Sequence, residues 1–264
     1  MYVHHFGRTF AADRTSGDNR WMRRLILVLL ACALMPVGTA AAEVRPPGLD
    51  RPLGTEQLSD EETISRWAFN LFPGAIFRKP RITSGGIGKL RRFTEDRQFE
   101  VYLVLASHID SEGQTWLRIR VPRRPNGTTG WVKADRLSRL TVVRTKLKVN
   151  RTTLRATLYK SGKRIWSSPI GIGAPGTPTP AGRFYVRERL RNLGGKGIYG
   201  PWAFGTSNYS TLTDWPGGGV VGIHGTNQPE LIPGRPSHGC IRVPNWNIRK
   251  LARLMPIGTP IEIV

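Results

Sequence analysis

The chain has 264 residues and a formal net charge of +22, with 40 Lys and Arg against 18 Asp and Glu. This length is enough for two small domains, each with its own core. Such a basic balance indicates nucleic acid or an anionic surface as partner, or simply a well-solvated surface. The export signal described next argues against nucleic acid and leaves an anionic cell envelope as the expected partner.

Residues 1–42 are predicted to be a signal peptide. Arg23 and Arg24 precede a short apolar run over 25–34, and small residues at 40–42 supply a cleavage site. We therefore expect an exported protein of the periplasm or cell wall. Removing the net +3 of these residues leaves about +19. Met22 is an alternative start, and an uncleaved signal segment or a lipidated Cys32 would instead tether the protein to a membrane.

Residues 43–74 are predicted to form a linker and a short helix. The stretch 43–57 is rich in proline and glycine, which is typical of linkers. Ser59 and Glu62 have capping-box spacing. The apolar residues that follow share one helical face until Pro73 and Gly74 end the pattern: Ile64, Trp67, Ala68 and Leu71.

Residues 75–140 change to a period of two, which indicates strands over 99–105, 115–121 and 129–132. Asn126-Gly127 is a tight-turn signal. The strand with Trp116 and the later Gly130-Trp131-Val132 resemble bacterial SH3-like domains, so we expect a small SH3-like β-barrel here. Each tryptophan by itself is more readily interpreted as a plain core residue, and His108 is given no role.

Residues 141–264 are predicted to be mainly β with one helix. Strands are expected over 146–149, 153–159, 163–170, 183–186, 220–223 and 260–264, and a helix capped by Asn245. Residues 188–219 are expected to form a long loop rich in glycine and aromatic residues, which acts as a lid or, for most of its aromatics, only packs.

Cys240 is the cysteine that remains once the segment carrying Cys32 is removed. An odd cysteine in an exported chain indicates a reactive thiol or an intermolecular disulfide. Cysteine attacks carbonyl groups as the thiolate, so a base must take its proton. His224 and His238 are both candidates, and spacing alone does not choose between them.

Four motifs together resemble the catalytic domain of the L,D-transpeptidases, which remodel peptidoglycan, over residues 141–264. They are Ile223-His224-Gly225-Thr226, Ser237-His238-Gly239-Cys240-Ile241-Arg242, Thr179-Pro180-Ala181-Gly182-Arg183-Phe184 and Gly258-Thr259-Pro260. The resemblance implies a transpeptidase-type β-sandwich or barrel with one helix. Asn150 stands where many relatives carry Asp, a departure without consequence for catalysis.

The resemblance also implies a role for each site residue. Cys240 would be the nucleophile, ionised by His224, the general base, which the carbonyl of Gly225 would orient. The amides of Gly239 and Cys240 would form an oxyanion hole shaped by His238, and Ser237 would support the turn. Arg242 would bind a substrate carboxylate or hold the loop. No metal and no cofactor is expected.

The implied reaction is acyl transfer between peptidoglycan stem peptides. Cys240 would attack the carbonyl of a diaminopimelate residue, D-alanine would leave, and an amine of a second stem would complete a 3→3 cross-link. Carboxypeptidase or protein-anchoring activity are alternatives within the family. Outside it stand a non-enzymatic wall-binding protein, a zinc site at His224, His238 and Cys240, and a disulfide-linked dimer. The oligomeric state and the acyl acceptor stay open.

Overall fold

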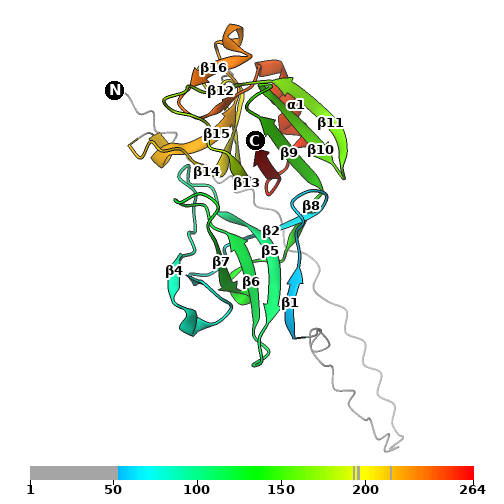
Figure 1. Cartoon of the computed structure of the whole chain (residues 1–264), viewed down its shortest axis with the longest axis vertical. Coiled ribbons are helices and arrows are strands. Elements are labelled where there is room, and N and C mark those ends of the chain that lie inside the picture. Colours follow the sequence, from blue (N-terminus) through cyan, green and yellow to red (C-terminus); the bar gives the residue numbers. More distant parts are fainter. Residues whose placement is uncertain (1–52, 193, 195–196, 215) are drawn as a thin grey trace, which may run out of the picture. The chain divides into compact units, whose positions relative to one another are not determined.

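The computed structural model describes residues 53–192, 194, 197–214 and 216–264 (Figure 1). The predicted signal peptide and most of the predicted linker lie outside these residues. Within the described part, the chain is mainly β, with two sheets and one α-helix. No helix in that part is long and apolar enough to cross a membrane.

The first sheet has eight strands among the described residues, in the order β4-β3-β7-β6-β5-β2-β8, with β1 paired to β5. Short 3-10 turns η1 (Ile82–Ser84) and η2 (Ala134–Arg136) interrupt them. The strands are β1 Gly54–Gln57, β2 Ser65–Phe69, β3 Ala75–Phe77, β4 Gly86–Lys89, β5 Val101–Ile109, β6 Thr115–Arg120, β7 Thr129–Lys133 and β8 Thr141–Val143. This sheet therefore extends beyond the 75–140 segment.

The prediction of a short helix before residue 75 is wrong, because residues 65–69 form strand β2. The polar residues with the spacing of a helix cap make a turn instead. Asp60 Oδ1 accepts hydrogen bonds from the backbone N–H groups of Glu62, Thr63 and Ile64 at 2.7–2.9 Å. β2 then pairs with β5 on one side and β8 on the other. Part of the predicted linker is also a strand, β1.

The second sheet has ten strands among the described residues, in the order β11-β10-β9-β18-β13-β14-β15-β17-β12-β16. Two 3-10 turns, η3 (Pro216–Gly219) and η4 (Pro229–Leu231), lie between its strands. The strands are β9 Thr145–Asn150, β10 Arg155–Lys160, β11 Lys163–Pro169, β12 Gly171–Gly173, β13 Gly182–Arg191, β14 Trp202–Tyr209, β15 Val220–His224, β16 Gly234–Ser237, β17 Ile241–Arg242 and β18 Pro260–Ile263.

The expected strands of this half are confirmed, but the expected loop over 188–219 is wrong in part. β13 continues to Arg191, and β14 occupies the middle of the segment with Phe204 and Tyr209 buried. Gly205 makes this pairing possible, since the carboxyl group of Glu188 fills the space where a side chain would stand. Glycine in a strand often marks such a close approach.

Helix α1 (Asn245–Leu254) closes the core of the second sheet. Its buried residues Ile248, Leu251 and Ala252 pack with apolar residues of the sheet, among them Leu147 and Phe204. The helix starts from Pro244 rather than from a side-chain cap by Asn245. Asn245 Oδ1 instead accepts the N–H of Thr226, which links the helix to the chain beyond β15.

The two sheets share a buried apolar cluster. Tyr185 of β13 packs with Trp67, Leu103 and Val143 of the first sheet, and its hydroxyl donates to the carbonyl of Val101 at 2.9 Å. Gly258 allows the chain to approach Trp67, because a side chain there would collide with the indole ring. The contact joins residues that are far apart in sequence.

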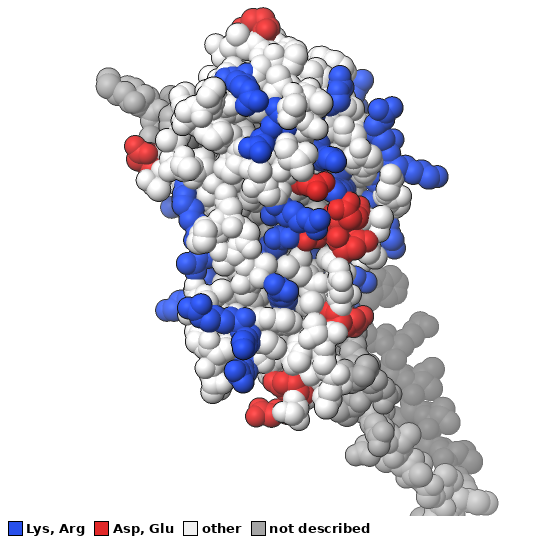
Figure 2. Space-filling view, in the orientation of Figure 1, with Lys and Arg blue, Asp and Glu red and all other residues white. Residues whose placement is uncertain are grey.

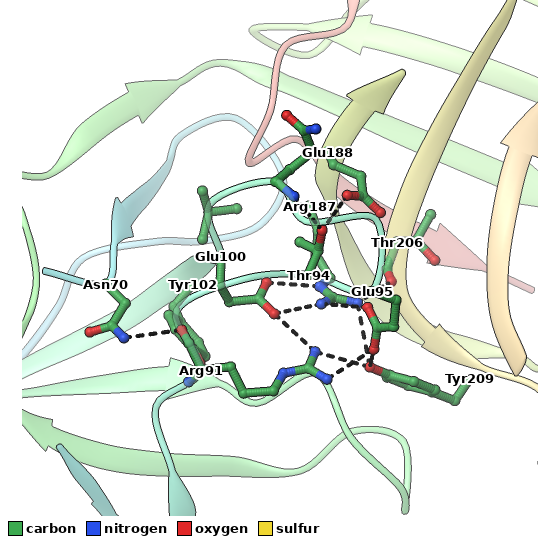
Figure 3. Close-up of polar contacts among 12 residues, drawn as sticks. Asn70, Arg91, Thr94, Glu95, Glu100, Tyr102, Arg187, Glu188, Thr206 and Tyr209 are labelled. Carbon is green, nitrogen blue, oxygen red and sulfur yellow. Dashed lines mark hydrogen bonds and ion pairs between the residues drawn. The ribbon is translucent and has the colours of Figure 1, made fainter. Parts of the chain in front are cut away.

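A buried ion-pair network lies beside that cluster (Figure 3). The side chains of Arg187 and Glu100 are both 0% exposed, and Arg187 Nε donates to Glu100 Oε1 at 2.9 Å. Glu95 pairs with Arg187 at 3.0 Å, and Arg91 reaches both carboxylates at 2.9 Å. The hydroxyl of Tyr209 donates to Glu95 at 2.7 Å. The positive charge of Arg187 in the second sheet is thus neutralised by carboxylates from the half of the chain that forms the first sheet.

We expect Arg187→Met to lower the free energy of unfolding by about 3–5 kcal/mol, because it leaves Glu100 buried without its main partner. Arg183→Met is the matched control on the same strand. Arg183 is 51% exposed and its nearest carboxylate lies 3.8 Å away, so its loss should cost about 1 kcal/mol or less. Urea denaturation measures both, and equal losses for the two variants would contradict this account of the network.

Candidate active site

The site forms where β15 and β17 run side by side. These strands are parallel, with Ile223 opposite Ile241 and His224 opposite Arg242. Cys240 directly precedes β17 and so lies beside Gly222. A Cβ built on Gly222 would lie 3.8 Å from His224 Cδ2 and 3.9 Å from Cys240 Sγ. The thiol and the imidazole therefore flank the same side of Gly222, which offers no side chain to separate them.

The imidazole of His224 is held in one orientation. Its Nδ1 donates to the carbonyl oxygen of Gly225 at 2.6 Å, which leaves Nε2 as the nitrogen able to accept a proton. The ring of Tyr199 packs edge-on against it, with 4.9 Å between ring centroids. Gly225 must be glycine, because a Cβ there would lie 2.3 Å from Asn245 Oδ1.

Burial favours the neutral form of both the imidazole and the thiol. His224 is 4% exposed, and this desolvation lowers its pKa to about 4, with Arg242 adding to the effect and the Gly225 carbonyl opposing it. Desolvation also raises the pKa of Cys240, although the N–H of Gly222, 3.4 Å from Sγ, and the charge of Arg242 favour the thiolate. The resting pair is a thiol beside a neutral imidazole, which differs from the ionised sulfur that we expected.

The turn before Cys240 is fixed by hydrogen bonds. Ser237 Oγ donates to the carbonyl of Cys240 at 2.6 Å and accepts the N–H of Gly239 at 3.2 Å. Thr179 Oγ1 donates to the carbonyl of Gly239 at 2.7 Å, which ties the Thr-Pro motif to the same turn. Gly239 has φ = 122°, a conformation that side-chain-bearing residues rarely adopt.

A pocket of about 60 Å³ opens over the thiol. Five of the expected residues line it: His224, Ser237, His238, Cys240 and Arg242. Gly225 and Gly239 support it from the backbone. Arg242 Nη1 donates to Gln228 Oε1 at 2.9 Å, while its Nε is buried with no hydrogen-bond partner among the described residues. Five further lining residues were not expected: Ile198, Tyr199, Ser210, Val220 and Val221.

Tyr199 is the clearest of the missed residues. It comes from the aromatic-rich segment, in which the sequence offers no signal to separate a ring at the site from rings in the core. Burial raises the pKa of its hydroxyl, and the negative charge of Cys240, when that sulfur is ionised, adds to the shift. Among the described residues, no group of three or more His, Cys, Asp and Glu is arranged to hold a metal ion.

We expect the alkylation rate of Cys240 by iodoacetamide to rise with pH and to reach its midpoint above the ordinary thiol pKa, because the raised pKa keeps the sulfur protonated at neutral pH. Stopped alkylation reactions read by intact mass would measure this. A plateau already reached near pH 6 would contradict the neutral pair. The unfolded protein in urea supplies the unperturbed thiol as control.

The part of the chain that carries this site is similar to known proteins. Residues 144–263 match the family model of the L,D-transpeptidase catalytic domain, YkuD. One curated relative is the putative L,D-transpeptidase YkuD of Bacillus licheniformis, which is 34% identical over 46% of this chain and 64% of its own length. Another is the putative L,D-transpeptidase YkuD of Bacillus subtilis, which is 36% identical over 40% of this chain and 58% of its own length. The chain thus spans less than two thirds of the length of these relatives.

Among solved structures, the catalytic domain from the E. faecium L,D-transpeptidase is 29% identical, with a TM-score of 0.34 over 46% of this chain and 96% of that one. The residues matched by the family model, 144–263, begin next to β9 and end in β18. They therefore contain all strands of the second sheet, helix α1 and the pocket. Residues 144–263 are thus similar in sequence to the L,D-transpeptidase catalytic domain of the YkuD family.

Proposed function

We propose that this protein is a cysteine-dependent L,D-transpeptidase that joins peptidoglycan stem peptides through 3→3 cross-links. One observation carries the proposal: the thiol of Cys240 and the imidazole of His224 flank Gly222 in a common pocket, and the imidazole is held by Gly225. This is the nucleophile, base and orienting group of an acyl-transfer site, with a backbone carbonyl in place of the usual carboxylate.

In the first half-reaction, the carbonyl carbon of diaminopimelate in a tetrapeptide stem is attacked by Cys240 Sγ while His224 Nε2 takes the thiol proton. The tetrahedral intermediate then expels D-alanine, whose nitrogen receives that proton. Because the resting imidazole is neutral, it is ready to accept a proton at neutral pH. The N–H of Gly222 stabilises negative charge on sulfur as the proton leaves.

The oxyanion of the intermediate needs donors fixed in advance. The amide of Cys240 is the main candidate in our proposal, since the amide of Gly239 already donates to Ser237 Oγ. His238 lines the pocket from the same turn and shapes the space around the oxyanion. One such donor contributes on the order of 3 kcal/mol to lowering the barrier.

In the second half-reaction, an amine of another stem attacks the thioester and gives its proton to His224. The sulfur then leaves and takes this proton from His224. Arg242 is the proposed partner of a substrate carboxylate. Its guanidinium reaches the pocket, and a fork of donors suits that group. Ile198 and Tyr199 border the pocket and would limit the access of water, which favours transfer over hydrolysis.

We propose that the protein works outside the cytoplasm, in the periplasm or cell wall, following the signal expected at residues 1–42. Figure 2 shows Lys and Arg side chains spread over the displayed face of the molecule, while the acidic ones gather in fewer places. With a formal charge of about +19 once residues 1–42 are removed, this surface suits an anionic envelope. We also propose that the first sheet is the SH3-like domain that precedes the transpeptidase-like domain.

We expect Cys240→Ala to abolish turnover and His224→Ala to lower it by about 10³-fold or more, because residues that act as a unit fail together. Incubation with purified tetrapeptide muropeptides, read by mass spectrometry, detects dimers. His108→Ala is the matched control, since His108 lies in the first sheet and bonds Thr55. Full activity of Cys240→Ala would refute the proposal, and an inactive His238→Ala beside an active His224→Ala would assign the base to His238.

The same spectra identify the acceptor. A cross-linked dimer with loss of D-alanine supports transfer to a stem amine, whereas a tripeptide without a dimer would make the protein a carboxypeptidase. Attachment of a protein amine would instead indicate anchoring. Wild-type protein that leaves every muropeptide unchanged and forms no thioester would favour a non-enzymatic wall-binding role.

A further inference from the structure

The turn between β6 and β7 of the first sheet reaches the catalytic domain beside its pocket. We call residues 208–214 and 216–219, which include the end of β14 and the chain that leads to β15, the rim segment. Asn126 of the turn pairs with the start of this segment. Its Nδ2 donates to the carbonyl of Tyr209 at 2.8 Å, and its Oδ1 accepts the N–H of Tyr209 at 3.0 Å. The amide side chain thus bonds the backbone as a neighbouring strand would.

Arg124 makes the larger set of contacts in this turn. Its guanidinium donates to the carbonyl of Ser210 at 2.8 and 3.0 Å, of Leu212 at 3.0 Å and of Gly218 at 2.9 Å. It also lies over the ring of Tyr209, 5.0 Å from the centroid. One planar cation therefore gathers three carbonyl groups from both ends of the rim segment, which the rigid fork of arginine is suited to do.

Asn208 and Tyr209 are also held by other contacts with the core, but the part of the rim segment after Ser210 has few further hydrogen bonds among the described residues, such as that from the N–H of Leu212 to Ser210 Oγ at 3.3 Å. The N–H of Ser210 donates to the carbonyl of Gly219 at 2.8 Å and closes the loop at its base. Beyond that point, three successive glycines, Gly217 to Gly219, all have positive φ, and glycine resists ordering because its unfolded chain has more conformations to lose. The described residues 211 to 214 are largely exposed. The contacts with Arg124 are thus a main restraint on this segment.

The same segment shapes the catalytic pocket. Ser210 lines the pocket, as do Val220 and Val221, which follow the segment directly. Ser210 also backs the nucleophile turn, since a Cβ on Gly239 would lie 3.4 Å from Ser210 Cβ. Its carbonyl accepts two of the bonds from Arg124. A displacement of Ser210 would therefore move the wall beside Cys240.

We propose that Arg124 is a positioning residue for the acyl-transfer site: the first sheet sets the wall of the Cys240 pocket through this guanidinium. The effect on catalysis rests on the proposed function, whereas the restraint on the rim segment does not. A shift of the wall by about 1 Å can cost up to about 10²-fold in rate. We therefore expect Arg124→Ala to slow acylation of Cys240 by a tetrapeptide stem by about 10- to 100-fold.

The experiment compares Arg124→Ala and Arg124→Lys with Arg123→Ala in the full chain. Arg123 is the matched control, because it carries the same charge in the same turn but donates to the carbonyl of Ile87 within the first sheet. Acylation by the stem and alkylation by iodoacetamide are followed by intact mass. We expect both Arg124 variants to acylate slowly, since lysine keeps the charge but not the fork, while alkylation stays within about threefold of wild type.

Hydrogen exchange at the amides of Ser210 and Leu212 supplies a readout that needs no activity. Exchange should be faster in Arg124→Ala than in wild type and unchanged in Arg123→Ala. Wild-type acylation by Arg124→Ala, or an equal loss in Arg123→Ala, would overturn the proposal. If wild type itself forms no acyl-enzyme, the proposed function fails and exchange alone decides: unchanged protection in Arg124→Ala then overturns the positioning role.

Discussion

The buried pair of Arg187 and Glu100 is the interaction on which the rest of the described structure depends. A guanidinium in the interior must be paired, and its partner here belongs to the other sheet. β13, which carries Arg187, pairs with β14, and β14 pairs with β15, which ends in His224. The electrostatic constraint that joins the sheets therefore lies two strands from the imidazole. The half of the chain that forms the first sheet supplies the carboxylates of Glu95 and Glu100 that neutralise Arg187 in this buried position.

Much of the catalytic half could be predicted from the sequence, because its strands alternate in the usual way and its site residues sit in short motifs. Strand β2 could not, since the spacing of Ser59 and Glu62 fits a helix cap as well as a turn, and pairing with β5 and β8 decides the outcome. The glycines and aromatic residues of β14 concealed its strand pattern. Tyr199 and Arg124 were missed for another reason: each acts on groups far away in sequence, which leaves no local pattern.

Three glycines build the site in three different ways. Gly222 leaves open the space between sulfur and imidazole and lends its N–H to the sulfur. Gly225 allows Asn245 to approach the backbone that holds His224. Gly239 takes a backbone conformation that turns the chain into Cys240. In the motifs around His224 and Cys240, glycines that the geometry requires thus stand next to the residues that the chemistry requires. Because these residues are neighbours in the chain, the motifs can be recognised from the amino-acid sequence alone.

The protonated state of the resting thiol has a consequence for the lifetime of the protein. Thiolates attack peroxides and disulfides, whereas neutral thiols react with them slowly. Burial that raises the pKa of Cys240 therefore shields the sulfur from sulfenic acid formation and from mixed disulfides, at a position where the described chain offers no second cysteine to rescue it. In the proposed reaction, the thiolate forms only as His224 takes the thiol proton during attack on the bound carbonyl group, so one sulfur atom would combine resistance to oxidation with reactivity toward substrate.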